Sequence, residues 1–125
     1  MRLFFTIREN LYFDSAFTRA FKRDKVRDAG GRPVLLPPQA DAVAETVAAL
    51  SEFGEIEGTP ANLSTEDGCR TLADWTAERA PQLDILVNNA GAVWGAPLAD
   101  HDDAAWSRVL DLNVKGVFHM TRFCR

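Results

Sequence analysis

One segment of the sequence combines residue types that suit the binding of a nucleotide. Residues 83–87 (LDILV) are almost continuously apolar, and Asn88-Asn89-Ala90-Gly91 follows them directly. Such a run is typical of a parallel strand covered on both faces, and open parallel sheets bind ligands outside the carboxyl ends of their strands. Short polar side chains and a glycine, which permits close backbone approach, suit a sugar and phosphates there. A plain strand-to-helix turn is the alternative, because Asn and Gly are common turn residues.

The second candidate is Asn113, which falls within a helix expected over residues 101–122. The apolar residues Trp106, Val109, Leu110, Val117 and Phe118 are expected to face inward on this helix, and Asn113 lies on the same stripe. A buried amide without partners costs about 1–3 kcal/mol, so we expect it to bond a backbone carbonyl or a water. The alternative is an asparagine paired within its own helix.

The elements around these residues alternate between strand and helix. Short strands are expected at 34–36 and 55–60, and helices at 40–52 and from Ser64 to about Glu78, where Ser64 and Asp67 resemble a capping box. Pro33 removes a ladder donor, so the strand at 34–36 should be at an edge or poorly formed. The alternation predicts an α/β fold with a parallel sheet.

Composition limits the function classes. Hydrophobic residues make up 46% and charged residues 26% of the 125 residues, which is ordinary for a globular protein. No apolar run approaches the roughly 20 residues that span a bilayer, and no secretory signal is evident, so no membrane partner is expected. Cys69 and Cys124 lie in no metal-ligand or redox spacing. We therefore expect two free thiols in a reducing cytoplasm and no metal site.

Residues 1–32 differ from the rest of the chain in charge. They are net positive, whereas residues 33–125 are net negative. Apolar residues over 11–28 follow the period of an amphipathic helix, and Gly30-Gly31 ends it. The charges of this stretch mix both signs on one helix, which is typical of a solvated face, so no nucleic-acid partner is expected.

These motifs together resemble the short-chain dehydrogenase/reductase family. LDILVNNAG is followed by Asn113 within LDLNVKGVFHMTR, with Trp106 before the second motif and PANLST upstream. The resemblance covers residues 40–125 and is greatest to 3-oxoacyl-[acyl-carrier-protein] reductases. It implies a partial Rossmann-like parallel sheet with flanking helices, a nicotinamide cofactor (NADP or NAD), and oxidoreduction of a small-molecule carbonyl or alcohol, such as a 3-oxoacyl thioester.

The resemblance also implies cofactor-binding residues. Asn89, Ala90 and Gly91 would line the ribose and nicotinamide, while Asn62 and Leu63 would meet the adenine. The family usually has Asp at position 62, accepting from the adenine amino group. Asn62 can still accept through its amide oxygen, without the charge.

The catalytic implication falls on Asn113, which would be the asparagine of the family's catalytic tetrad. It would hold a water of the proton relay through the main chain of its helix. The helix 101–122 often forms a dimer face in relatives, so a homo-oligomer through this helix is expected.

Two motifs of the family are missing from the sequence. The phosphate cradle T-G-x-x-x-G-x-G has no match in residues 1–39, and no Y-x-x-x-K occurs, because Tyr12 has Ala16 four residues on. We therefore expect an incomplete chain, with an atypical, helical N-terminal segment (1–32) and a partial dinucleotide-binding domain (33–125). The alternative function is a non-catalytic remnant or interaction module.

Overall fold

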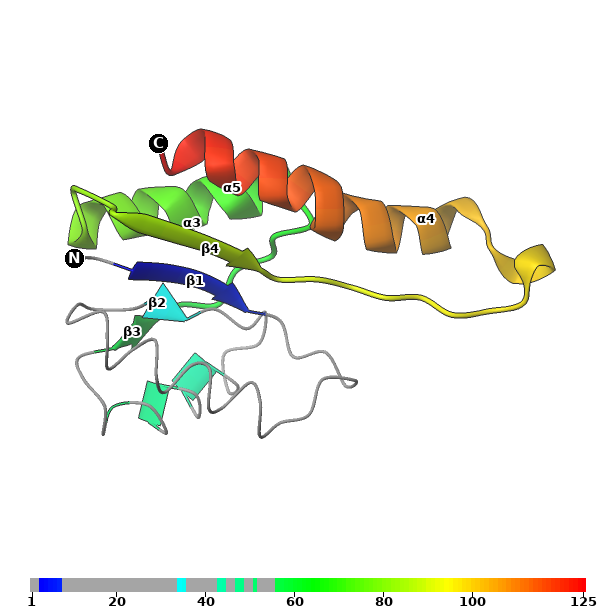
Figure 1. Ribbon diagram of the computed structural model, residues 1–125, viewed down its shortest axis with the longest axis horizontal. Helices are drawn as coiled ribbons and strands as arrows, with labels where there is room; N and C mark the ends of the chain where they lie inside the picture. The colour runs from blue at the N-terminus through cyan, green and yellow to red at the C-terminus, as the bar shows by residue number, and fades with distance from the viewer. Residues whose placement is uncertain (1–2, 8–33, 36–42, 45–46, 49–50, 52–55) are drawn as a thin grey trace.

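The fold is built on a parallel sheet with helices along one side (Figure 1). The computed structural model describes residues 3–7, 34–35, 43–44, 47–48, 51 and 56–125. Its four strands are β1 (Leu3–Ile7), β2 (Val34–Leu35), β3 (Glu57–Gly58) and β4 (Ile85–Asn89), in the order β3-β2-β1-β4. All three pairings are parallel, which confirms the predicted α/β class.

Strand β1 is an element that the sequence does not predict. Its residues pair with β4 from Leu3 opposite Ile85 to Ile7 opposite Asn89, so they belong to the sheet and not to a separate helical segment. LFFTI contains aromatic and β-branched residues that favour strands, but its position at the start of the chain leaves no turn signal before it. The predicted helix over 11–28 lies outside the described residues.

The other short elements lie where the sequence predicts them. Strands β2 and β3 fall within 34–36 and 55–60, and residues 43–44 and 47–48 are helical, as expected within 40–52. The sequence predicts that the strand at 34–36 is either at an edge or poorly formed. Strand β2 lies between β1 and β3, so the first alternative does not hold, whereas its length of two residues agrees with the second.

Helix α3 (Glu66–Arg79) follows the loop after β3. Its N-cap is Thr65 and not the predicted Ser64, and Thr65 Oγ1 accepts a hydrogen bond from the Gly68 N–H at 3.1 Å. A hydroxyl at this position satisfies one of the unpaired amides of the first turn, where Glu66 and Asp67 also complement the helix dipole.

The long helix expected over 101–122 is divided by a π-helical turn. Helix α4 (Asp103–Leu110) begins at Asp102, whose carboxylate accepts from the Ala105 N–H at 2.8 Å. The π-helical turn Asp111–Gly116 follows, and helix α5 (Val117–Phe123) completes the element. Asn113 lies within the π-helical turn, so the period of 3.6 residues that places it on an inward stripe does not apply there.

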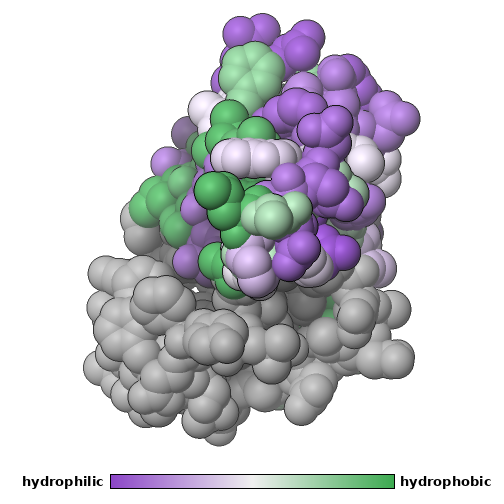
Figure 2. Space-filling model, turned by 90° about the vertical axis from the view of Figure 1, so that its right-hand side faces the viewer, coloured by the Kyte–Doolittle hydropathy of each residue, from purple (hydrophilic) through white to green (hydrophobic). Residues whose placement is uncertain are grey.

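The inward face of this element differs from the prediction. Trp106, Leu110 and Phe118 are 57%, 42% and 60% exposed. Together with Val114 they form a stripe of large apolar residues at every fourth position, which we call the outer stripe. Figure 2 shows hydrophobic side chains gathered in a band at the end of the molecule where α4 projects. The buried residues of the element are smaller or lie between these positions: Ala105, Leu112, Gly116 and Met120.

The core lies where α3 packs against the π-helical turn and α5. Its buried residues come from the loops after β3 and β4 as well as from the helices: Leu63, Cys69, Leu72, Ala92, Leu112 and Met120. The core therefore includes the loop segments in which the sequence places the candidate site.

Candidate functional site

The predicted site residues lie on two loops at one edge of the sheet. Asn62 and Leu63 follow β3, while Ala90 and Gly91 follow Asn89, the last residue of β4. Because all strands are parallel, their carboxyl ends meet at the same edge, where open α/β sheets bind ligands. The structure thus brings both predicted groups to the expected edge.

Asn113 binds the backbone of the loop after β4. Its Oδ1 accepts from the Ala92 N–H at 2.7 Å, and its Nδ2 donates to the Ala92 carbonyl at 2.9 Å. This confirms the prediction that the amide bonds a backbone carbonyl, and the partner belongs to another element and not to its own helix. Both polar atoms of the side chain are used to hold this loop in place.

The main chain around Asn113 departs from α-helical bonding. The Val117 N–H, which would bond the Asn113 carbonyl in an α-helix, donates to the Val114 carbonyl. The Asn113 carbonyl thus lies in a stretch of irregular helical bonding. Single π-helical turns inside helices are frequent at functional sites.

The same turn also contacts the loop after β3, through Gly116. A Cβ at Gly116 would stand 2.5 Å from the Leu63 carbonyl oxygen, so only glycine permits this approach. The buried Cys69 thiol lies beside the contact, 3.5 Å from the Leu63 carbonyl and 3.9 Å from the Gly116 carbonyl. The π-helical turn thus joins the two loops that carry the predicted cofactor contacts.

Asn62 is fixed by its own loop. Its Oδ1 accepts from the Ser64 N–H at 3.1 Å, and its main-chain carbonyl accepts from Thr65 N at 3.4 Å and Thr65 Oγ1 at 3.2 Å. Gly68 lies so close below the Asn62 carbonyl that a side chain there would overlap it. The exposed Asn62 side chain thus bonds its own loop.

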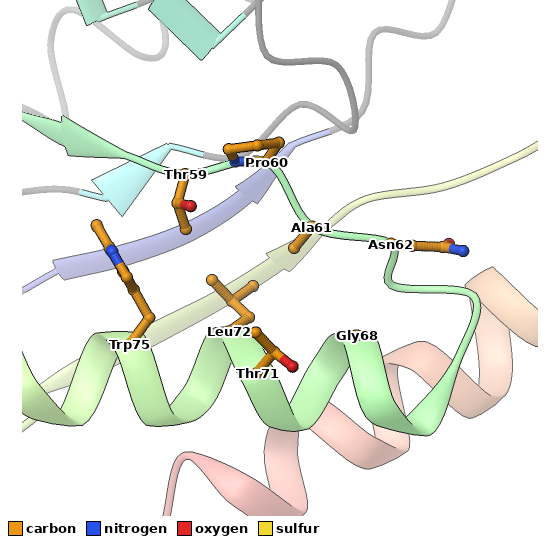
Figure 3. A pocket seen from close by; sticks show the side chains of 8 residues that line it. All are labelled: Thr59, Pro60, Ala61, Asn62, Gly68, Thr71, Leu72 and Trp75. Carbon is orange, nitrogen blue, oxygen red and sulfur yellow. The ribbon is translucent and has the colours of Figure 1, made fainter.

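A cavity of about 210 Å³ lies between this loop and α3 (Figure 3). Its walls are mostly apolar and consist of Thr59, Pro60, Ala61, Asn62, Gly68, Thr71, Leu72 and Trp75. The side chain of Asn62 points away from this cavity, toward the carboxyl edge of the sheet. Asn62 thus belongs to the cavity lining and also to the surface that carries the predicted adenine contact.

Comparison with known proteins decides the family. The model of the short chain dehydrogenase family matches residues 24–124. The chain belongs to the short-chain dehydrogenase family. Its parallel sheet with flanking helices is the Rossmann-type architecture that the sequence predicts.

Curated members of the family are similar over most of this chain. It is 44% identical over 91 residues to the rhamnolipids biosynthesis 3-oxoacyl-[acyl-carrier-protein] reductase of Pseudomonas aeruginosa, which covers 73% of this chain and 36% of that protein. It is 39% identical over 82 residues to a Mycobacterium tuberculosis hydroxy-methyl-oxo-hexahydro-indene-carboxyl-CoA reductase, covering 64% of this chain and 31% of that protein. The chain spans about one third of these relatives.

Solved structures of the family superpose on nearly the whole chain. A complex of Pseudomonas aeruginosa RhlG with NADP has a TM-score of 0.81 at 32% identity, covering 98% of this chain and 46% of that one. A Burkholderia phymatum short-chain dehydrogenase in complex with NAD has a TM-score of 0.77 at 28% identity, covering 98% and 42%. The chain spans about half of these structures.

Other polar groups of this short-chain dehydrogenase chain have structural roles. Asn88 Nδ2 donates to Thr121 Oγ1 at 3.2 Å, and Thr121 Oγ1 donates to the Val117 carbonyl at 2.8 Å, which ties β4 to α5. Trp94 is 43% exposed and lies under the Arg108 guanidinium, 4.5 Å from the ring centroid.

The two cysteines are free thiols, as predicted, and neither is activated. Burial raises the pKa of Cys69 to about 11, with smaller contributions from Cys124 and Glu66, and burial raises the pKa of Cys124 to about 11. Both thiols are therefore protonated near neutral pH and poor nucleophiles. Across the described residues, no cluster of His, Cys, Asp and Glu could hold a metal ion, and no helix could cross a membrane.

Two positions of the site are not predicted from sequence. Ala92 contributes only backbone groups, so its side chain gives no signal of its hydrogen bonds to Asn113. Gly116 does carry a signal, because a glycine within a helical pattern costs about 1 kcal/mol and usually has a packing reason. That reason is the carbonyl of Leu63.

Proposed function

We propose that the chain supplies the part of a cofactor site that faces the base, ribose and nicotinamide in a short-chain oxidoreductase. The reaction would pass hydride between a nicotinamide dinucleotide, NADP or NAD, and a carbonyl or alcohol. The observation that carries the proposal is the double hydrogen bond between Asn113 and Ala92, which holds the loop after β4 at the carboxyl edge of the sheet.

The residues at this edge fit such a cofactor. A Cβ at Gly91 would meet only Asn113 Oδ1, at 3.5 Å, which is an ordinary contact. Packing among the described residues therefore does not require glycine at this position, whereas close approach of a ligand to the backbone would. Asn62 adds to the same edge an exposed amide whose oxygen accepts from the Ser64 N–H.

The roles follow from these positions. Asn62 and Leu63 would bind the base, and Asn89, Ala90 and Gly91 would bind the ribose and orient the nicotinamide. The bound cofactor supplies the hydride chemistry, while the chain supplies position and polarity.

Asn113 would act in two ways. Its side chain is a positioning group for the loop after β4, because both of its polar atoms bond Ala92. Its carbonyl would hold a water of the proton relay, a role supported by the place of Asn113 within the π-helical turn.

The substrate we propose is a small-molecule carbonyl compound of the 3-oxoacyl thioester class. The support is the 44% identity to a Pseudomonas aeruginosa protein described as a 3-oxoacyl-[acyl-carrier-protein] reductase. The free thiols Cys69 and Cys124 are consistent with the proposed cytoplasmic location.

A second copy of this chain is the partner we propose for the outer stripe. Four large apolar side chains there, Trp106, Leu110, Val114 and Phe118, are 42–60% exposed on successive turns of one element. Contiguous apolar surface of this kind marks interaction sites. In a symmetric dimer, the outer stripe of one copy would pack antiparallel against the outer stripe of the other.

Cofactor binding is the test of the proposed function. Titration of NADPH, and separately NADH, into the 125-residue chain is followed by calorimetry. We expect saturable binding of at least one of the two nucleotides. Its Kd should be on the order of micromolar, which corresponds to a binding free energy of about 8 kcal/mol. Absence of saturable binding by both would contradict the proposal and favour the alternative of an interaction module.

A further inference from the structure

The cavity between the loop after β3 and helix α3 has an aromatic wall. Figure 3 shows the Trp75 indole edge-on, standing from α3 toward the level of Thr59. Arg79 lies one helical turn after Trp75, with its guanidinium 4.1 Å from the ring centroid, whereas the lining residue Thr71 lies one turn before it. The guanidinium therefore covers one face of the indole, and the other face is turned toward the cavity.

Polar contacts of Arg79 support this wall. Its Nε lies 3.0 Å from a carboxylate oxygen of Glu57 on β3, and its Nη1 donates to the Trp75 carbonyl at 3.2 Å. The guanidinium that covers the indole is thus tied both to the sheet and to α3.

The size and the lining of the cavity limit what it can take. An apolar cavity of about 150 Å³ binds benzene, so a volume of about 210 Å³ has room for one six-membered ring with a small substituent. The buried Leu72 and the ring of Pro60 add apolar surface, and aromatic rings stack offset on an indole face. None of the described lining residues is charged, and burial of an unpaired charge is costly, so the cavity suits a neutral aromatic ring.

Two threonine hydroxyls of the lining can pair with a substituent on such a ring. Thr59 comes from the segment after β3 and Thr71 from α3, on the two sides of the cavity (Figure 3). Within the part of the chain that the structure describes, neither hydroxyl is hydrogen-bonded to another residue. A ring hydroxyl both donates and accepts, so it can accept from one threonine and donate to the other.

We propose that this cavity is a binding site for a neutral phenol, that is, a single aromatic ring that carries a hydroxyl group. The ring stacks on the cavity face of Trp75, and its hydroxyl pairs with Thr59 and Thr71. Asn62 borders both this cavity and the predicted adenine contact, whereas Trp75 and the two threonines have no predicted cofactor role. The site goes beyond the proposed function and does not depend on it.

Phenol titrated into the uniformly labelled chain, without nucleotide, tests the site by NMR. The chain contains three tryptophans, so the indole N–H resonances of Trp94 and Trp106 are internal controls. We expect saturable shifts at the indole N–H of Trp75 and at the amides of Thr59 and Thr71, with no change at Trp94 and Trp106. Benzoate, a ring of similar size that is charged at neutral pH, should give no saturable shift at Trp75.

Valine substitutions separate the hydroxyls from the shape of the cavity. Thr59→Val and Thr71→Val keep a branched side chain and remove the hydroxyl. Each should raise the Kd of phenol about three- to tenfold, which is the net contribution of one hydrogen bond. The Kd of toluene, which has no hydroxyl, should not change in these variants, and thermal melts check that each variant is folded.

Two results would overturn the proposal. Equal shifts at all three indoles, or shifts that rise without saturation, would show general adhesion of phenol to exposed aromatic side chains. A phenol Kd that is the same in the wild type and in both valine variants would show that the hydroxyls do not recognise the ligand. Because no nucleotide is present, either result leaves the proposed cofactor site standing.

Discussion

Asn113 and Ala92 hold each other by two hydrogen bonds, one in each direction, at 2.7 and 2.9 Å. Through them the π-helical turn Asp111–Gly116 is joined to the loop after β4. The same turn meets the loop after β3 where Gly116 touches the Leu63 carbonyl. A single turn of helix therefore sets the spacing of the two loops at the carboxyl edge of the sheet.

Replacement of Asn113 by leucine should destabilise the chain. The substitution leaves the N–H and C=O of Ala92 without partners, at an expected cost of about 2–4 kcal/mol in the free energy of unfolding. Urea unfolding measures this change. Ser107→Leu is the matched control, because Ser107 is exposed on the same helical element outside the outer stripe, and its replacement should cost far less. Equal costs for the two variants would show that the pair contributes little.

Addition of a methyl group at Gly116 should separate the two loops. In Gly116→Ala the Cβ would stand 2.5 Å from the Leu63 oxygen, so backbone must move, at a cost of about 1–3 kcal/mol. A Cβ at Gly95 would have no described atom within 4 Å, and Gly95→Ala should change stability by less than about 0.5 kcal/mol. Thermal melts of both variants test this, and similar melting temperatures would contradict the close contact.

The cysteines should make the fold less stable in alkaline solution. Burial raises the pKa of Cys69 and of Cys124 from 9.0 to about 11, so the folded state keeps its thiol protons where the unfolded state loses them. Their contribution to stability is complete below about pH 9 and declines as the pH rises toward 11. Urea midpoints at several pH values should fall over this window. In the Cys69→Ala, Cys124→Ala double variant, the urea midpoint should fall less steeply with pH. If the double variant shows the same fall as the wild type, groups other than the two thiols cause it.

The outer stripe should control association. Leu110→Lys with Phe118→Lys should convert a dimer into a monomer, because it places two charges in the proposed contact. Light scattering after size exclusion measures the mass. Ser107→Lys, on an exposed position of the same helix outside the stripe, is the control and should leave the dimer intact. A wild-type chain that is monomeric at all accessible concentrations would contradict the proposal.

The sequence predicts much of the fold because its strongest signals are local. The apolar run before Asn88 and the strand–helix alternation are enough for a parallel α/β sheet. Strand β1 is missed because no turn signal precedes it in the sequence, and its pairing with β4 joins residues far apart in the chain.

Helical periodicity does not predict which face of residues 101–122 is buried. The large apolar residues of 101–122 predict an inward face, but Ala105 and Gly116 allow closer packing, and the π-helical turn shifts the phase between α4 and α5. Asn113 is found from sequence because an amide stands out in a helix, whereas its partner is a backbone group that any residue could supply.

The central claim is that a nicotinamide dinucleotide binds at the edge formed by the loops after β3 and β4. Amide NMR shifts of the uniformly labelled chain during an NADPH titration test it most directly. Saturable shifts are predicted at Leu63, Ala90 and Gly91 and at the side-chain amide of Asn62, with smaller changes at the cavity residues Thr71 and Trp75. Absence of saturable shifts, or shifts centred on Thr71 and Trp75 instead, would contradict the account.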